Sequence, residues 1–85
     1  MHTNRELLAV ARAEALFTSP MNTGSQPTAA EVRDAIRDSL RSHRGIRGCV
    51  DGLAAAYGDC PEIASIRMRW ARRVVAAIYP PGADR

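Results

Sequence analysis

The sequence has no lysine, few aromatic residues and no long apolar run. A membrane-crossing helix needs about 20 consecutive apolar residues, so we expect no contact with the membrane interior. The first residues lack a basic segment followed by a long apolar stretch, which argues against a secretory signal and predicts a cytoplasmic location. The apolar residues are mostly Ala, Leu, Ile and Val, which favours close helix packing over the core of a sheet.

Residues suited to metal binding or catalysis are also scarce. The two cysteines, Cys49 and Cys60, are eleven positions apart. A helix between them would separate their Cα atoms by roughly 16 Å, whereas a disulfide allows about 7 Å. Together with His43 they offer three potential ligands, but their spacing matches no zinc pattern and a structural site needs four. No nucleophile with a base, pair of carboxylates or phosphate-binding loop is recognisable. We therefore expect no enzyme, no metal, no cofactor and no small-molecule substrate.

The positive charge is concentrated at one end of the chain. All 12 basic residues are arginines, and the formal net charge is +3. Residues 1–60 carry seven arginines and seven acids, whereas residues 61–85 carry five arginines and two acids. The whole net charge therefore lies in the last segment, and such asymmetry indicates an anionic partner there.

Hydrophobic periodicity predicts an all-α fold, a small bundle of four helices within a single domain, residues 1–85. The helices are expected at about residues 4–17, 28–43, 47–57 and 60–79, with a loop at 18–27 and a disordered tail at 80–85. No segment alternates between apolar and polar residues, so no strand is expected. A chain of this length buries only about 60–65% of its unfolded surface, and its core must use nearly every apolar side chain.

Capping signals set the expected helix ends. Residues 3–6 and 28–31 fit capping boxes at the starts of the first and second helices. Gly45 is expected to stop the second helix, and Gly58 to end the third in a left-handed conformation. Asp59 then becomes the N-cap of the fourth helix. A short turn between the last two helices would give them a helix-turn-helix arrangement.

The same periodicity predicts which side chains form the core. Trp70 is expected to be a core anchor rather than an exposed interface residue. The predicted core residues are Leu7, Leu8, Ala11 and Phe17 on the first helix; Val32, Ala35, Ile36, Ser39, Leu40 and His43 on the second; Val50, Leu53, Ala54 and Tyr57 on the third; and Ile63, Ala64, Ile66, Trp70, Ala71, Val74, Ala77 and Ile78 on the fourth, with Met68 and Val75 at the edge.

The opposite face of the fourth helix is basic. Arg69, Arg72 and Arg73 share it, and it is either a solvated face or a binding surface. Arg67 falls within the apolar arc instead. It is expected to extend to the rim of the core or to pair with Asp51 or Asp59.

Residues 53–75, "LAAAYGDCPEIASIRMRWARRVV", resemble the DNA-reading region 4 of extracytoplasmic-function sigma factors. Ala54 and Gly58 match an alanine and the turn glycine of that family, whereas the family usually has an apolar residue where this chain has Asp59. The resemblance implies that Ala64, Met68 and Ala71 pack inward. It also implies that Arg67, Arg69, Arg72 and Arg73 face the bases and phosphates of promoter DNA. The chain is similar as well to short helical actinomycete proteins with a "GD-P-E…RMRWA" pattern.

Two functions follow from the sequence. The first is a small non-catalytic regulatory protein that contacts DNA or the transcription machinery through Arg67, Arg69, Arg72 and Arg73. The alternative is a helical protein–protein interaction module, either an adaptor or a homodimer, that binds no nucleic acid. The expected partners are accordingly DNA or an acidic protein surface, with self-association as a further expectation.

Overall fold

The computed structural model describes residues 4–80, which form four helices and no strand. The helices are α1 (Asn4–Phe17), α2 (Ala29–Ser42), α3 (Ile46–Asp59) and α4 (Pro61–Ile78). The predicted all-α bundle is confirmed, and every helix end lies within two residues of its predicted position. The predicted capping box at residues 3–6 and the predicted tail at 80–85 each lie partly outside the described residues.

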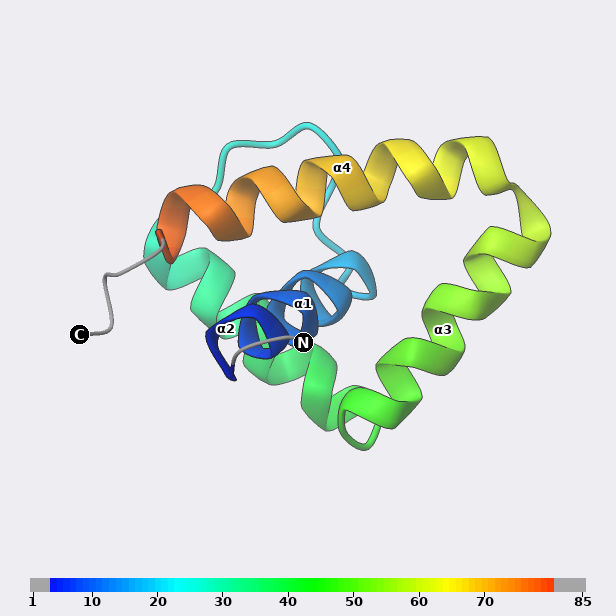
Figure 1. The fold of residues 1–85 in the computed structure, drawn as a ribbon, viewed down its shortest axis with the longest axis horizontal. Helices are drawn as coiled ribbons and strands as arrows, with labels where there is room; N and C mark the ends of the chain where they lie inside the picture. Colours follow the sequence, from blue (N-terminus) through cyan, green and yellow to red (C-terminus); the bar gives the residue numbers. More distant parts are fainter. Residues whose placement is uncertain (1–3, 81–85) are drawn as a thin grey trace.

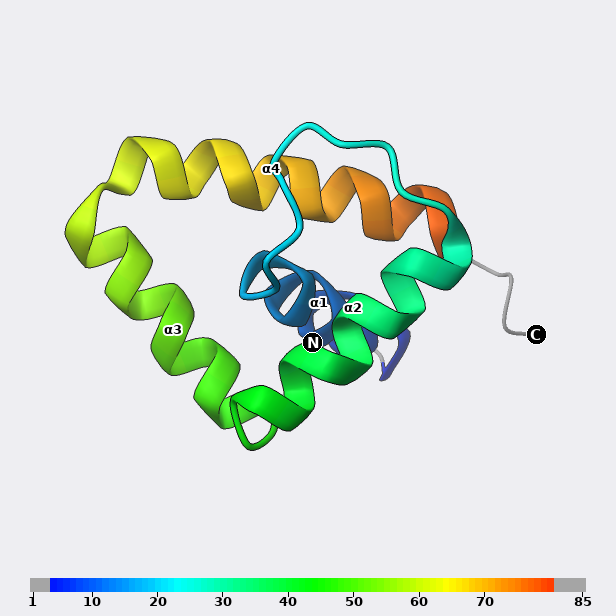
Figure 2. The ribbon, with the colours of Figure 1, turned by 180° about the vertical axis from the view of Figure 1, so that it is seen from behind.

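Helices α2, α3 and α4 form a three-sided frame, and α1 passes through the middle of it (Figure 1). The N-terminal end of α1 lies on the face shown in Figure 1, and its C-terminal end lies on the opposite face (Figure 2). Helix α1 contacts each of the other three helices.

The core lies where the second half of α1 meets α4. Ala13, Leu16 and Phe17 of α1 are buried there. The predicted core positions Leu7 and Leu8 are wrong, because both side chains are exposed. The apolar periodicity extends along the whole helix, but residues 4–10 lie at its outer end and stay exposed.

The buried face of α4 is rotated about the helix axis relative to the face that the sequence predicts. Ala64, Met68, Ala71 and Val75 form its centre, although Met68 and Val75 were expected at the edge. The prediction that Ile63, Ile66 and Ala77 are core residues is wrong, because all three are exposed. Ile63 is 67% exposed and Ile66 is 52% exposed, whereas Trp70 is buried as predicted. The isoleucines stay exposed because the end of α1 packs against Ala64 and Met68, and Ile63 and Ile66 lie on other sides of α4.

Helix α3 also buries a different stripe from the predicted one. Val50 and Ala54 are exposed, while Cys49 is fully buried. Beside it, a Cβ atom on Gly48 would overlap the backbone carbonyl of His43. Helices α2 and α3 can therefore approach this closely only because position 48 is glycine.

The end of α2 confirms the predicted stop at Gly45. The Gly45 N–H donates to the Leu40 carbonyl at 2.7 Å, and the Arg44 N–H donates to the Arg41 carbonyl at 3.3 Å. This pair of bonds is a Schellman motif. Its two residues after the cap have positive φ, 61° at Arg44 and 98° at Gly45. Arg44 therefore has a left-handed backbone conformation, which glycine adopts more easily than a residue with a side chain.

The corner between α3 and α4 differs from the prediction. Gly58 and Asp59 are both helical, so neither the left-handed cap nor the aspartate N-cap forms. Cys60 alone joins the two helices, with extended φ and ψ of −152° and 90°. The break falls there because Pro61 disfavours the helical conformation in the residue before it.

A partly buried polar cluster lies where the C-terminal ends of α1 and α2 meet α3. The Thr18 and Ser39 hydroxyls lie 2.7 Å apart, and His43 Nδ1 lies 2.9 Å from the Ser39 carbonyl oxygen. The Cys49 thiol lies 4.0 Å from the Ser39 hydroxyl. Both Cys49 and Cys60 are free thiols.

Candidate nucleic-acid interface on α4

The rotation of α4 is fixed by the loop that follows α1. Trp70 is 3% exposed, and its indole N–H donates to the Ser25 carbonyl at 2.9 Å. An indole in such a site satisfies its donor while its ring fills the core. The loop therefore covers one flank of α4, the core covers a second, and the remaining arc faces solvent.

Arg67 lies beneath the same loop and donates one hydrogen bond to the last residue of α1 and two to the loop. Nε donates to the Phe17 carbonyl and Nη2 to the Ser19 carbonyl, each at 2.7 Å, and Nη1 donates to the Thr23 hydroxyl at 2.8 Å. The guanidinium also lies 5.6 Å from the Phe17 ring and 5.1 Å from the Trp70 ring. Burial lowers the pKa of Arg67 from its ordinary value, because desolvation disfavours the charged form.

The predicted pairing of Arg67 with Asp51 or Asp59 does not occur. The guanidinium instead binds the last carbonyl of α1 and two oxygens of the loop, where regular secondary structure does not supply donors. The sequence carried one signal of this role, an arginine within an apolar arc. It could not reveal the acceptors, which lie 44 to 50 positions away.

The other three predicted arginines lie together on the open arc of α4. Arg69, Arg72 and Arg73 are exposed. Their i, i+3 and i+4 spacing places them on one side of the helix, within about one turn. Among residues 4–80, no acidic side chain forms an ion pair with any of them. We call this surface the arginine face.

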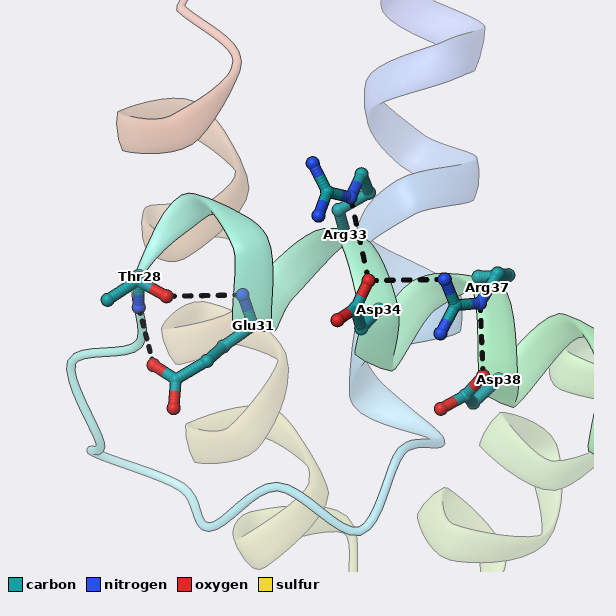
Figure 3. A network of polar contacts seen from close by, with 6 residues as sticks. All are labelled: Thr28, Glu31, Arg33, Asp34, Arg37 and Asp38. Atoms are coloured by element: carbon teal, nitrogen blue, oxygen red, sulfur yellow. Dashed lines mark hydrogen bonds and ion pairs between the residues drawn. The ribbon is translucent and has the colours of Figure 1, made fainter.

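Helix α2 carries arginines in a different electrostatic setting (Figure 3). Asp34 accepts from Arg33 at 3.5 Å and from Arg37 at 3.2 Å, and Arg37 also contacts Asp38 at 3.2 Å. Local neutralisation of this kind leaves little charge for a phosphate. Arg33 and Arg37 of α2 are thus neutralised locally, whereas α4 presents three neighbouring arginines without acidic partners in residues 4–80.

A second surface was not predicted from the sequence. An apolar groove of about 380 Å³ opens between α1, α3 and α4. Val10, Leu53, Tyr57, Met68 and Val75 are among the side chains that line it. Periodicity assigned most of these residues to a closed core, and only the spacing of the helices reveals that the core is open on this side.

The described residues give no indication of a metal site or a membrane span. Within residues 4–80, no three His, Cys, Asp or Glu side chains gather as metal ligands. None of the helices in that part of the chain has the length and apolarity to cross a membrane. Comparisons of the chain with protein-family models, curated proteins and solved structures find no match.

Proposed function

We propose that this chain is a small, non-catalytic regulatory protein that contacts DNA or the transcription machinery through α4. The observation that carries the proposal is the arginine face: Arg69, Arg72 and Arg73 are exposed, close together and without acidic partners in the described residues. Arginine pairs well with phosphate, and clustered arginines give the sequence-independent part of DNA affinity. Arg67 is left out of the proposed contacts, because it holds the loop.

The resemblance to sigma factor region 4 gives the proposal secondary support. Ala64, Met68 and Ala71, which that resemblance places inward, are buried. The corner before α4 departs from a glycine-containing turn, since Cys60 alone separates the helices. We therefore propose contact with the DNA backbone through the arginine face, and assign no base to an individual side chain.

The test is a salt titration of binding to mixed-sequence duplex DNA. Each phosphate contact contributes roughly −0.9 to the log–log slope of affinity against salt. Replacing Arg69, Arg72 and Arg73 together by Gln should flatten the slope by about 2–3 units without unfolding the chain. The matched control replaces Arg33, Arg37 and Arg41 by Gln, which removes the same formal charge from α2. Its slope should change by less than about 1 unit.

Absence of binding by the unmodified chain at low salt would rule out the DNA proposal, because non-specific contacts are strongest there. Equal effects of the two triple variants would show that net charge, rather than the arginine face, governs binding.

A second candidate function, a protein–protein interaction module, is favoured by a separate observation. Several large aliphatic side chains remain exposed on this small fold, and an apolar groove lies open beside some of them. Exposed apolar surface of this kind is typical of interaction sites. This candidate would stand alone if the salt titration showed no DNA binding.

A further inference from the structure

The loop between α1 and α2 forms a second wall beside the arginine face. It crosses α4 and then runs along that helix to the start of α2 (Figure 2). A hollow of about 290 Å³ lies between the loop and α4, and Arg73 is among the side chains that line it. A single water needs only about 10–15 Å³ of such space, so the hollow has room for a phosphodiester group and its waters. The hollow therefore continues the arginine face onto the loop.

The electrostatic setting of this hollow suits a negative group. Within residues 4–80, no acidic side chain lines it, whereas Glu14 lines the apolar groove on the other flank of α4. Residues 15–30, which include the whole loop, contain neither aspartate nor glutamate. The charge in the hollow thus comes from Arg73, and the loop adds no carboxylate that would repel a phosphate.

The loop also brings free hydrogen-bond donors to the hollow, which Gly24, Ser25 and Gln26 line. The Ser25 N–H and hydroxyl are already used, because both donate to the Asn22 carbonyl, at 3.2 and 2.8 Å. The Gln26 side chain is exposed, and within residues 4–80 neither its amide nor the backbone N–H groups of Gly24 and Gln26 donate a hydrogen bond. Amide side chains and backbone N–H groups are common donors to DNA phosphates.

Side chains of α4 hold the loop in place without any ligand. Arg67 donates to the Ser19 carbonyl and to the Thr23 hydroxyl. The Trp70 indole donates to the Ser25 carbonyl at 2.9 Å. Because both anchors belong to α4, the loop keeps a fixed position relative to the arginine face. A surface that is ordered in advance loses less entropy when it binds.

We propose that the loop is a second contact element for the DNA backbone, and that Arg73 and the donors of Gly24 and Gln26 bind one phosphate together in the hollow. The inference rests on the proposed DNA contact and adds uncharged donors to it. Charged and uncharged contacts respond differently to salt, because only a contact that neutralises a phosphate releases a counterion. The two kinds of contact can therefore be measured separately.

The test is the salt titration on mixed-sequence duplex DNA, with variants of the two amide side chains of the loop. Gln26→Ala should weaken binding about three- to tenfold at every salt concentration, the effect of one lost hydrogen bond. The log–log slope should not change, because no charge is removed. The matched control is Asn22→Ala, which removes an exposed amide that does not line the hollow. It should change affinity by less than about twofold.

A gain of affinity gives a second test, which a folding defect cannot imitate. Gln26→Arg places a guanidinium beside Arg73 and should steepen the slope by about 0.9, as expected for one further phosphate contact. Ala54→Arg adds the same charge at an exposed position of α3 that does not line the hollow. It should steepen the slope by less than about 0.3.

The outcomes separate this proposal from the one on which it rests. Absence of DNA binding by the unmodified chain at low salt would overturn both. If the unmodified chain binds and Gln26→Ala binds equally well, the loop contact alone is wrong. Equal losses in Gln26→Ala and Asn22→Ala, or equal slopes for Gln26→Arg and Ala54→Arg, would also overturn the loop contact.

Discussion

Helices α2 and α4 both carry arginines at helical spacing, yet the two sets do different things. On α2, Arg33 and Arg37 alternate with aspartates and form ion pairs along an exposed surface. On α4, Arg69 and Arg73 face solvent without such partners, and Arg67 lies beneath a loop and binds oxygens of that loop and of the end of α1. The role of an arginine in this fold therefore depends on the neighbours within one turn and on what covers the helix.

The two helices also begin differently. Thr28 accepts from the Glu31 N–H at 3.2 Å while the Glu31 carboxylate accepts from the Thr28 N–H at 2.8 Å, a complete capping box (Figure 3). The N-cap of α4 is Cys60, whose side chain makes no cap hydrogen bond. Helix α2 is thus stabilised by local contacts, whereas α4 depends on burial and on Arg67 and Trp70.

The largest expected difference between the helices is in the stability contributed by one arginine. Arg67→Met should lower the free energy of unfolding by about 2–4 kcal/mol, because it removes the donor from the last carbonyl of α1 and from a loop carbonyl. Arg37→Met, at an exposed ion pair, should change it by less than about 1 kcal/mol. Urea denaturation of both variants measures the difference. Similar values for the two would contradict the role assigned to Arg67.

The second prediction transfers the acidic pattern of α2 to α4. Ser65→Glu and Ala77→Glu together place a carboxylate four residues from Arg69 and from Arg73. DNA affinity at low salt should fall about tenfold, or about 1.4 kcal/mol, because the new carboxylates compete with phosphate. The control is Ser65→Gln with Ala77→Gln, which keeps the side-chain length without the charge. Equal affinities of the two double variants would argue against the arginine face as the contact.

The third prediction concerns the two helix starts. Thr28→Ala removes the capping box and should lower the free energy of unfolding by about 1 kcal/mol. Cys60→Ser adds a hydroxyl acceptor at the uncapped start of α4 and should raise it by about 0.5–1 kcal/mol. Thermal or urea unfolding gives both values. A destabilised Cys60→Ser would show that the half-buried thiol contributes more by packing than a cap does.

The smallest expected effect lies at the end of α2. Arg44→Gly should raise the free energy of unfolding by about 0.5–1 kcal/mol, because glycine adopts positive φ without strain but loses more backbone entropy. Arg41→Gly, three residues earlier in the last turn of α2, is the control and should lower stability by about 1 kcal/mol. If both substitutions destabilise equally, the positive φ of Arg44 carries no strain.

The sequence by itself determined the four helices and most of their ends. Proline, glycine and capping residues act through the local backbone, so Thr28, Gly45 and Pro61 mark boundaries that hold in any arrangement of the helices. Charge patterning is equally local, since an arginine and an aspartate within one turn are neighbours on any helix. The contrast between α2 and the arginine face was therefore predictable.

The tertiary structure alone decided which faces are covered. Periodicity identifies an apolar face, but not how far along the helix a neighbour extends, and so Leu7, Leu8 and Ile66 were assigned to a core that does not reach them. The partners of Arg67 lie at the end of α1 and on the loop after it, distant in sequence. The groove exists only because α1, α3 and α4 are spaced apart on one side. Both depend on contacts between segments that no local signal connects.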